Sequence, residues 1–378
     1  MIPLSLYIHI PWCIQKCPYC DFNSHKSPSQ LPEMEYVAAL VADLRHDLEH
    51  FTLNKPTINT IFIGGGTPSL LSGEAYHQLF LELNKIVTIP AGTEITLEAN
   101  PGTVEQKRFQ NYRELGINRL SLGIQSFHAK HLKALGRIHD DTQAHKAIES
   151  ARKAGFTNIN LDIMHSLPHQ TQAEGIADLR TAIRHQPEHI SWYQLTLEPN
   201  TVFYKTAPPL PEEELTFHLE EEGFSLLKEH DYTRYEISAF CKPQKHASHN
   251  LNYWQFGDYL GIGAGAHGKI TKDRKVYRTQ KHRIPRDYLS KDKPFLTHCE
   301  KIDKENLLFE FMLNTTRLEN PIANELFTAT TGGDFSELFS KLNQAKVKGL
   351  IDCRETHWQV TKLGRKFTND LQALFLPD

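Results

Sequence analysis

The sequence has little of several features that would place it in a special class. Among 378 residues it has only 6 cysteines, 4 methionines and 4 tryptophans, and its formal net charge is −3. No apolar run approaches the roughly 18 residues of a membrane-spanning helix, so we expect a soluble protein. The near-neutral charge does not indicate nucleic-acid binding. With 39% hydrophobic residues, the chain can bury a large core in two or three domains.

Six cysteines in so long a chain do not suggest a disulfide framework. No secretory signal precedes Ile8, which predicts a cytoplasmic protein with reduced thiols. Half of the cysteines fall in one stretch, residues 6–23, with the sequence LYIHIPWCIQKCPYCDFN. There Cys13, Cys17 and Cys20 follow a strand-like run at C-x3-C-x2-C spacing. Three soft ligands in one short loop predict a metal site.

Two kinds of metal site fit this loop. A [4Fe-4S] cluster usually has four cysteine ligands, so three would leave one iron open to a ligand that is not protein. A structural zinc site, with His9 or His25 as the fourth ligand, is the alternative. The lack of a second cysteine pair at zinc-ribbon distance, and the aromatic and proline residues between the thiols, favour the cluster. The spacing leaves both interpretations open.

Strand-like and helix-like segments alternate over the first half of the chain. Apolar patterning predicts strands over residues 5–10, 57–63, 94–99, 119–124, 158–164 and 189–197. It predicts helices over residues 35–51, 74–87, 104–115, 142–154 and 173–185. This alternation predicts a parallel sheet with right-handed crossovers, and six units predict an incomplete (β/α)6 barrel of the α/β class.

Unusual residues stand where the predicted strands end, which is where barrel chemistry occurs. They are Gly64, Gly65, Gly66 and Thr67 after the second strand, Glu98 in the third, Gln125 after the fourth and Asp162 in the fifth. A glycine run can also be a tight turn, and a buried carboxylate can also be a structural ion pair or a helix cap. Their shared position favours ligand contact.

These motifs carry a family resemblance. The C-x3-C-x2-C loop with an aromatic at Tyr19 resembles the radical S-adenosylmethionine (SAM) superfamily. YIHIPWC, CPYCDFN, GGGTPS and GIQSF resemble its oxygen-independent coproporphyrinogen oxidase-like branch, most closely the HemW family of haem chaperones, over nearly the whole chain. The resemblance implies a [4Fe-4S] cluster on Cys13, Cys17 and Cys20. It also implies SAM on the open iron, whose one-electron reduction yields methionine and a 5′-deoxyadenosyl radical.

The resemblance also implies which residues surround SAM. The backbone of the glycine run would hold the methionine amino group, Glu98 would face the ribose, and Tyr7 would lie near the cluster. The full set of expected SAM contacts is Tyr7, Tyr19, Phe22, Gly64, Gly65, Thr67, Glu98, Gln125, Arg137, Asp162 and Ile262.

A second motif, HNLNYW at residues 249–254, matches the HNxxYW pattern associated with haem in relatives of this kind. His249 would ligate haem iron, and Tyr253 and Trp254 would offer apolar surface to the porphyrin. The alternative is a packed aromatic loop whose histidine is only hydrogen bonded. Competing iron ligands nearby in the sequence are Cys241, His246 and His267.

We predict three regions: a radical SAM partial barrel over residues 1–205, a barrel extension with the haem motif over 206–300, and a small C-terminal domain over 301–378. Helices near 307–314 and 335–346, followed by strand-like residues 349–351 and 358–360, resemble a winged helix. Few basic residues lie on its candidate recognition helix, so we expect no nucleic acid there. Covering the barrel or docking a partner fits better.

Two functions remain. The first is a haem chaperone that passes haem to haem-dependent acceptors, among them membrane-bound respiratory enzymes. The second is SAM-dependent decarboxylation of coproporphyrinogen III to protoporphyrinogen IX. Dehydrogenases of that kind usually have a further cysteine at the position of Phe22 and an N-terminal extension, and both departures favour the chaperone. We also expect an electron donor for the cluster, and leave catalysis, a homodimer and peripheral membrane association open.

Overall fold

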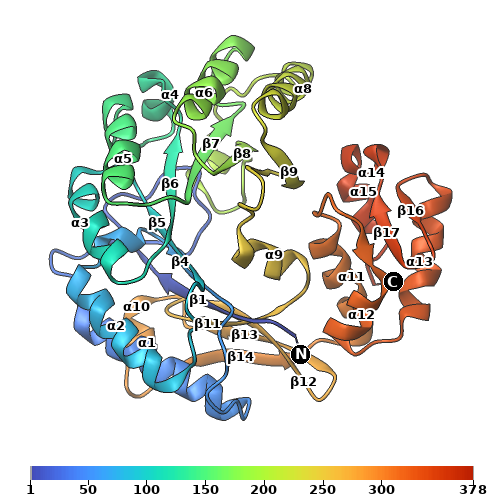
Figure 1. Cartoon of the computed structure of the whole chain (residues 1–378), viewed down its shortest axis with the longest axis horizontal. Coiled ribbons are helices and arrows are strands. Elements are labelled where there is room, and N and C mark those ends of the chain that lie inside the picture. The colour runs from blue at the N-terminus through green and yellow to red at the C-terminus, as the bar shows by residue number, and fades with distance from the viewer. Residues whose placement is uncertain (1, 378) are drawn as a thin grey trace.

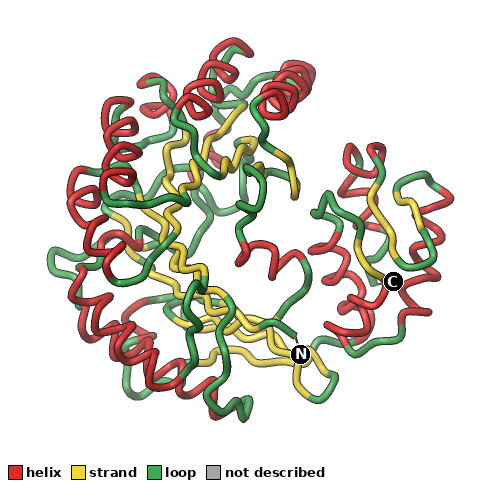
Figure 2. The backbone as a smooth tube through the Cα atoms, viewed as in Figure 1, coloured by secondary structure: helices red, strands yellow, loops and turns green. Residues whose placement is uncertain are grey.

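A curved, open sheet forms the larger part of the molecule. The computed structural model describes residues 2–377, and for residues 103–107 it describes the backbone alone. Twelve strands form an arc with helices on its outer side (Figures 1 and 2). The strand order is β14-β13-β12-β11-β1-β4-β5-β6-β7-β8-β10-β9, and within the described residues its two ends do not pair, so no closed barrel forms. The predicted α/β class with an incomplete barrel is confirmed.

The six predicted parallel strands form the centre of this sheet. They are β1 (Leu4–Ile10), β4 (Thr60–Gly65), β5 (Glu94–Ala99), β6 (Arg119–Gln125), β7 (Ile159–His165) and β8 (His189–Gln194). The helices that follow them are α1 (Glu33–His50), the short 3-10 helix η1 (Pro68–Leu70), α2 (Gly73–Ile86), α3 (Thr103–Glu114), α4 (Ala129–Ala134), α5 (Asp141–Lys153) and α6 (Gln172–Arg184). Asp140 and Thr171 begin α5 and α6 with capping boxes.

Strand β1 shows how the sequence sets the two faces of the sheet. Leu6, Ile8 and Ile10 are 0% exposed and belong to the core beneath the helices. Tyr7 and His9 alternate with them, so these two side chains lie on the inner face of the arc. The inner face is therefore where polar side chains from neighbouring strands meet.

Residues 202–301 extend the same sheet on both sides. One edge receives β9 (Thr233–Glu236) and β10 (Ala239–Cys241), and the other receives β11 (Asp258–Ile262), β12 (His267–Lys272), β13 (Lys275–Lys281) and β14 (Leu296–Lys301). The helices of this region are α7 (Val202–Thr206), α8 (Glu213–Glu229), α9 (Ser248–Trp254) and α10 (Pro285–Tyr288). A turn at residues 237–238 separates β9 from β10, and there the Glu236 carboxylate accepts a hydrogen bond from the Ser238 N–H at 3.0 Å.

The C-terminal residues form a smaller unit with a hydrophobic core that also takes in residues of α9 and β13. Its elements are α11 (Lys304–Thr315), β15 (Ile322–Ala323), α12 (Asn324–Thr331), α13 (Phe335–Val347), β16 (Ile351–Cys353), β17 (His357–Val360), α14 (Lys362–Lys366) and α15 (Thr368–Ala373). The three strands pair in the order β15-β17-β16, in keeping with the expected winged helix. The three-part division of the chain stays a prediction.

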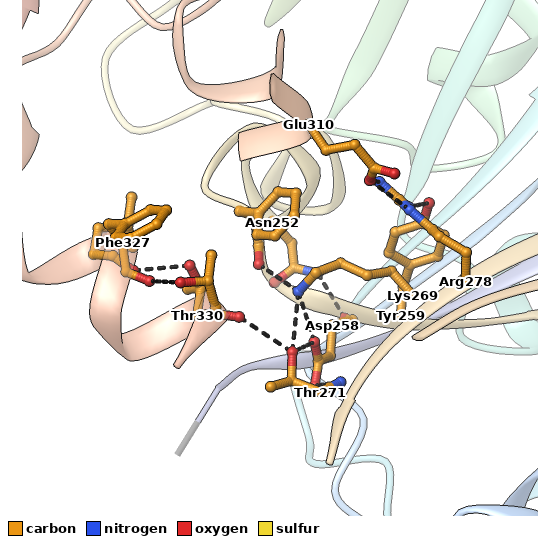
Figure 3. Close-up of polar contacts among 12 residues, drawn as sticks. Asn252, Asp258, Tyr259, Lys269, Thr271, Arg278, Glu310, Phe327 and Thr330 are labelled. Atoms are coloured by element: carbon orange, nitrogen blue, oxygen red, sulfur yellow. Dashed lines mark hydrogen bonds and ion pairs between the residues drawn. The ribbon is translucent and has the colours of Figure 1, made fainter. Parts of the chain in front are cut away.

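Polar contacts join this unit to the extended sheet, as Figure 3 shows. Arg278 of β13 forms an ion pair with Glu310 of α11, with 2.8 Å between Nε and Oε2. The Thr271 hydroxyl of β12 donates to the Thr330 carbonyl of α12 at 3.2 Å. Among residues 2–377, no helix combines the length and apolar character that crossing a bilayer requires.

Candidate cofactor site at the carboxyl ends of the strands

A closed loop between β1 and α1 holds the three thiols. The short strands β2 (Trp12–Cys13) and β3 (His25–Lys26) pair in parallel and bring the two ends of the loop together. The Ser27 N–H donates to the Cys13 carbonyl at 2.8 Å. Cys13 is 9% exposed, and the other two thiols of the loop are half-buried. The loop therefore presents its sulfurs, all free thiols, at the carboxyl ends of the strands.

The three sulfurs lie near enough to influence one another. Burial raises the pKa of the Cys13 thiol, and the neighbouring Cys20 and Cys17 raise it further, against hydrogen bonds from Thr67 and Ser24. Burial likewise raises the pKa of Cys20. Metal binding requires thiolates, so the charge of an iron-sulfur cluster would be what deprotonates these groups. The donor set fits the three-cysteine cluster that the spacing predicts.

Distant segments hold the end of the loop in place. The Asn23 side-chain amide donates to the carbonyls of Ala264 and Arg283, each at 2.9 Å. His9 Nε2 donates to the Asn23 carbonyl at 2.8 Å, and His9 Nδ1 lies 2.9 Å from the Tyr7 hydroxyl. His25 Nε2 donates to the Arg283 carbonyl at 3.0 Å. Both candidate zinc ligands are thus engaged in hydrogen bonds to protein groups, which weakens the zinc alternative.

The glycine run packs against the cysteine loop. A Cβ at Gly65, where φ is +116°, would lie 2.6 Å from the His9 ring, and one at Gly66 would lie 2.6 Å from the Trp12 carbonyl oxygen. The Gly66 N–H donates to the Ile10 carbonyl at 2.7 Å. Close backbone packing therefore explains these glycines before any ligand is considered. Contact between this backbone and SAM stays a prediction.

A polar chain links the loop to three strand ends. The Arg137 guanidinium donates to the Cys17 sulfur at 3.6 Å and, through Nη2, to Asn100 Oδ1 at 2.6 Å and the Gly123 carbonyl at 2.8 Å. Asn100 in turn donates to the Thr67 hydroxyl at 3.0 Å. Asn100 was not among the predicted site residues. Its place at the end of a strand, directly after Glu98-Ala99, was the available signal.

A cavity of about 190 Å³ opens beside this chain. Its lining includes Cys17, Thr67, Asn100, Arg137 and His139. The cavity thus lies between the thiol loop and the loops that follow β4, β5 and β6. A molecule bound to the open iron of a cluster on these thiols could extend into this cavity.

Glu98 of β5 and Asp162 of β7 lie on the two strands that flank β6, near enough for the Asp162 charge to affect Glu98. Burial raises the pKa of Glu98 to about 8, and the Asp162 charge adds to the effect. The Glu98 carboxylate accepts from the Gly65 N–H at 3.1 Å. Asp162 accepts from the Ser121 hydroxyl at 2.8 Å and the Asn160 amide at 2.9 Å, and burial raises its pKa too. Such carboxyl groups are suited to hydrogen bonding with the hydroxyls of a sugar.

Two further predicted residues lie on this inner face. Gln125 is 6% exposed, has φ of +67°, and accepts a hydrogen bond from the Tyr193 hydroxyl at 2.9 Å. Tyr7 contacts His9, and burial raises its pKa above the usual value. Tyr19 is part of the thiol loop, and burial raises its pKa as well. The structure therefore brings these side chains to the same end of the sheet as the cysteines.

Two predicted SAM contacts are not gathered with the others. Phe22 is 62% exposed. Ile262 is 0% exposed and pairs in register with Ile8, so its side chain lies in the core on the helix side of the sheet. Because side chains alternate along a strand, only the backbone of Ile262 can be reached from the inner face of the sheet.

The HNLNYW motif lies at the opposite end of the strands. Helix α9 sits inside the arc (Figure 1), and its Ser248 and His249 N–H groups donate to the Glu94 carboxylate, at the start of β5, at 3.0 Å each. His249 Nδ1 lies 2.8 Å from the hydroxyl of Thr60, the first residue of β4. Four residues of strand, about 13 Å, separate Thr60 from Gly64 at the other end.

The aromatic residues of this motif pack around its histidine. The Tyr253 hydroxyl lies 2.8 Å from His249 Nε2, so both imidazole nitrogens have hydrogen-bond partners and the side chain is 0% exposed. The Arg317 guanidinium lies 4.3 Å over the Trp254 ring. This arrangement resembles the packed aromatic alternative, and haem ligation by His249 stays a prediction.

Comparison with known proteins places these features in a family. The family model described as the radical SAM superfamily matches residues 7–182, and the HemN C-terminal domain matches residues 302–367. The solved structure of the Escherichia coli coproporphyrinogen III oxidase HemN, described as a radical SAM enzyme, matches with a TM-score of 0.83 at 22% identity. That match covers 99% of this chain and 90% of HemN, and at this identity it shows the fold.

Similarity to curated proteins extends over the full length. Proteins named "Heme chaperone HemW" from Haemophilus influenzae and Escherichia coli are 45% and 46% identical, and each match covers 100% of this chain and 98% or 99% of the relative. The HemW of Bacillus subtilis is 36% identical over 98% of this chain and 99% of its own length. The superfamily match implies a [4Fe-4S] cluster and SAM as cofactors, which the thiol loop and the strand ends described above fit. The chain belongs to the HemW family within the radical SAM superfamily.

Proposed function

We propose that this protein is a haem chaperone that binds haem and passes it to haem-dependent acceptor proteins. The observation that carries the proposal is the similarity, over the full length of both chains, to proteins named heme chaperones. The exposed Phe22 supports it, because it occupies the position where coproporphyrinogen dehydrogenases usually have a further cysteine.

In this proposal Cys13, Cys17 and Cys20 hold the cluster, which supplies a one-electron reductant for SAM. Arg137 positions the loop through Cys17, and Asn23 ties it to Ala264, just after β11, and to Arg283. The SAM contacts are those predicted from the sequence: Tyr7, Tyr19, Phe22, Gly64, Gly65, Thr67, Glu98, Gln125, Arg137, Asp162 and Ile262. For Phe22 and Ile262 the geometry offers the least support.

The partners follow from the same role. Acceptors would be haem-dependent enzymes, among them membrane-bound respiratory enzymes, and an electron donor would serve the cluster. A cytoplasmic location with peripheral contact to membranes agrees with such acceptors. A homodimer is a further part of this proposal, and the molecular mass of the protein in solution tests it.

The test is an anaerobic haem titration of cluster-reconstituted protein, followed by visible absorbance and then by transfer to an apo acceptor. Stoichiometric binding and transfer support the chaperone, whereas absence of binding contradicts it. The second candidate is coproporphyrinogen III dehydrogenation, which the likeness to the HemN fold brings forward. Formation of protoporphyrinogen IX by the SAM-loaded protein would establish it in place of a pure chaperone role.

A further inference from the structure

The proposed haem needs an iron ligand, and His249 does not offer one in this fold. Both of its ring nitrogens have partners, Thr60 and Tyr253, and the side chain is 0% exposed. The Glu94 carboxylate holds the first turn of α9 in place. Coordination by His249 would displace the partner of one ring nitrogen and would require this fully buried side chain to become accessible.

An open cavity lies on the inner side of the sheet, at the edge that strands β11 to β14 form. Its volume is about 510 Å³, and its lining comes from β11 to β14: Tyr259, His267, Arg278, Thr279, Gln280, His298 and Glu300. A smaller cavity of about 150 Å³ shares Tyr259 and Arg278 with it and is also lined by Tyr253 and Trp254. We call the two together the sheet groove. Its size is in the ~300–1,000 Å³ range of sites for small organic ligands.

His267 is the imidazole of this groove that is ready to coordinate. It is exposed at the first position of β12, and among the residues whose side chains the structure describes its imidazole has no hydrogen-bond or ion-pair partner. Partial burial of the ring, with the charges of Arg278 and Arg283, lowers the pKa of His267, which favours the neutral imidazole that binds iron. The other groove histidine, His298, lies on the edge strand with its Nε2 3.0 Å from the Glu300 carboxylate.

The surroundings of His267 suit the rest of a haem molecule. Arg278 lies beside Tyr259, whose hydroxyl accepts its Nη1–H at 2.8 Å (Figure 3). Its Nε and Nη2 donate to the Glu310 carboxylate, so this guanidinium is already paired and shapes the groove wall. The side chain of Arg283 is exposed near His267. Guanidinium groups pair with carboxylates in a planar fork, which is how haem propionates would be recognised. The rings of Tyr253 and Tyr259, 4.5 Å apart, add an aromatic wall.

We propose that haem binds in the sheet groove with His267 as its axial iron ligand and Arg283 facing a propionate. The assignment rests on the proposed haem-binding function. It also gives the HNLNYW motif a different part: Tyr253 and Trp254 line the groove, while His249 anchors their helix to the barrel strands.

The test compares His267→Ala with unaltered protein in the full, cluster-reconstituted chain. Because His267 is exposed, we expect the variant to fold and to unfold at the same denaturant concentration. We expect haem affinity about tenfold weaker or more, a changed Soret band, and loss of the histidine ligand in resonance Raman or EPR spectra. Free imidazole should restore the original spectrum. His218→Ala, a change at an exposed histidine of α8, is the matched control and should bind haem as the unaltered protein does.

Two more variants separate the competing ligands. His249→Gln keeps a side chain able to hydrogen bond to Thr60 and should retain the spectrum of the unaltered protein. If instead His249→Gln or His298→Ala removes the histidine signature while His267→Ala keeps it, the assignment is overturned. Absence of haem binding by the unaltered protein would overturn the proposed function itself, and the two failures are therefore distinguishable.

Discussion

Removing the Lys281 charge should destabilise the protein strongly, because that charge neutralises two buried carboxylates. Lys281 of β13 is 0% exposed, and its Nζ lies 2.6 Å from an oxygen of Asp43 and 2.6 Å from an oxygen of Asp47, both on α1. Asp43 also accepts hydrogen bonds from the Gly263 N–H at 3.1 Å and the Tyr288 hydroxyl at 2.8 Å. This group of buried charges therefore joins α1 to strand β13 and holds the end of β11.

The substitution Lys281→Met keeps most of the side-chain volume and leaves both carboxylates without their cation. Breaking a buried pair in this way costs about 3–5 kcal/mol, a large part of the ~5–15 kcal/mol by which domains are usually stable. Urea unfolding at pH 7 under anaerobic conditions measures the loss. Lys275→Met, the same change at an exposed position of the same strand, is the control and should cost no more than about 0.5 kcal/mol.

The pH dependence of this variant provides a second test of the same reasoning. Burial already raises the pKa of Asp43 to about 6, against the opposing charge of Lys281. Without the lysine, the Asp43 carboxyl group takes up a proton in the folded state, so the stability of the variant falls as pH rises. The difference in unfolding free energy between the variant and the unaltered protein should be smaller at pH 5 than at pH 7. A loss below about 1 kcal/mol at pH 7, equal to that of Lys275→Met, would refute the argument.

Three further predictions concern the cofactor site. Asn23→Ala removes two hydrogen bonds that anchor the thiol loop, worth about 1–3 kcal/mol together, so reconstituted protein should hold less iron and lose it faster to a chelator; unchanged iron content and loss rate would contradict this. In SAM-free protein, Glu98 with its pKa of about 8 binds a proton that the unfolded chain releases near 4.5. Stability should therefore fall between about pH 4.5 and 8, by about 5 kcal/mol at most, and Glu98→Gln should flatten this profile in urea titrations. Arg137→Lys cannot reach both Cys17 and Asn100, so calorimetry should find SAM binding about tenfold weaker at unchanged iron content, and equal affinity would count against this geometry.

Local patterns in the sequence were enough to predict the elements and the general place of the site. Alternating apolar residues marked the six central strands within a few positions, as for β5 over Glu94–Ala99 and β1 over Leu4–Ile10. The spacing of Cys13, Cys17 and Cys20 predicted one thiol loop after the first strand. These features depend on residues near one another in the chain, so side-chain periodicity and turn chemistry carry them.

The tertiary structure decided which distant groups meet. Asn23 is 241 residues from Ala264, and Lys281 is 234 residues from Asp47, yet each pair is in direct contact. No local pattern predicts such partners, because they depend on strand order and on the curvature of the sheet. His249 shows the same limit: its neighbours in the sequence suggested a haem ligand, whereas the fold buries it at the amino ends of the strands. The sequence by itself thus determined the elements and the cysteine loop, and long-range packing decided which side chains face the open space where a ligand can bind.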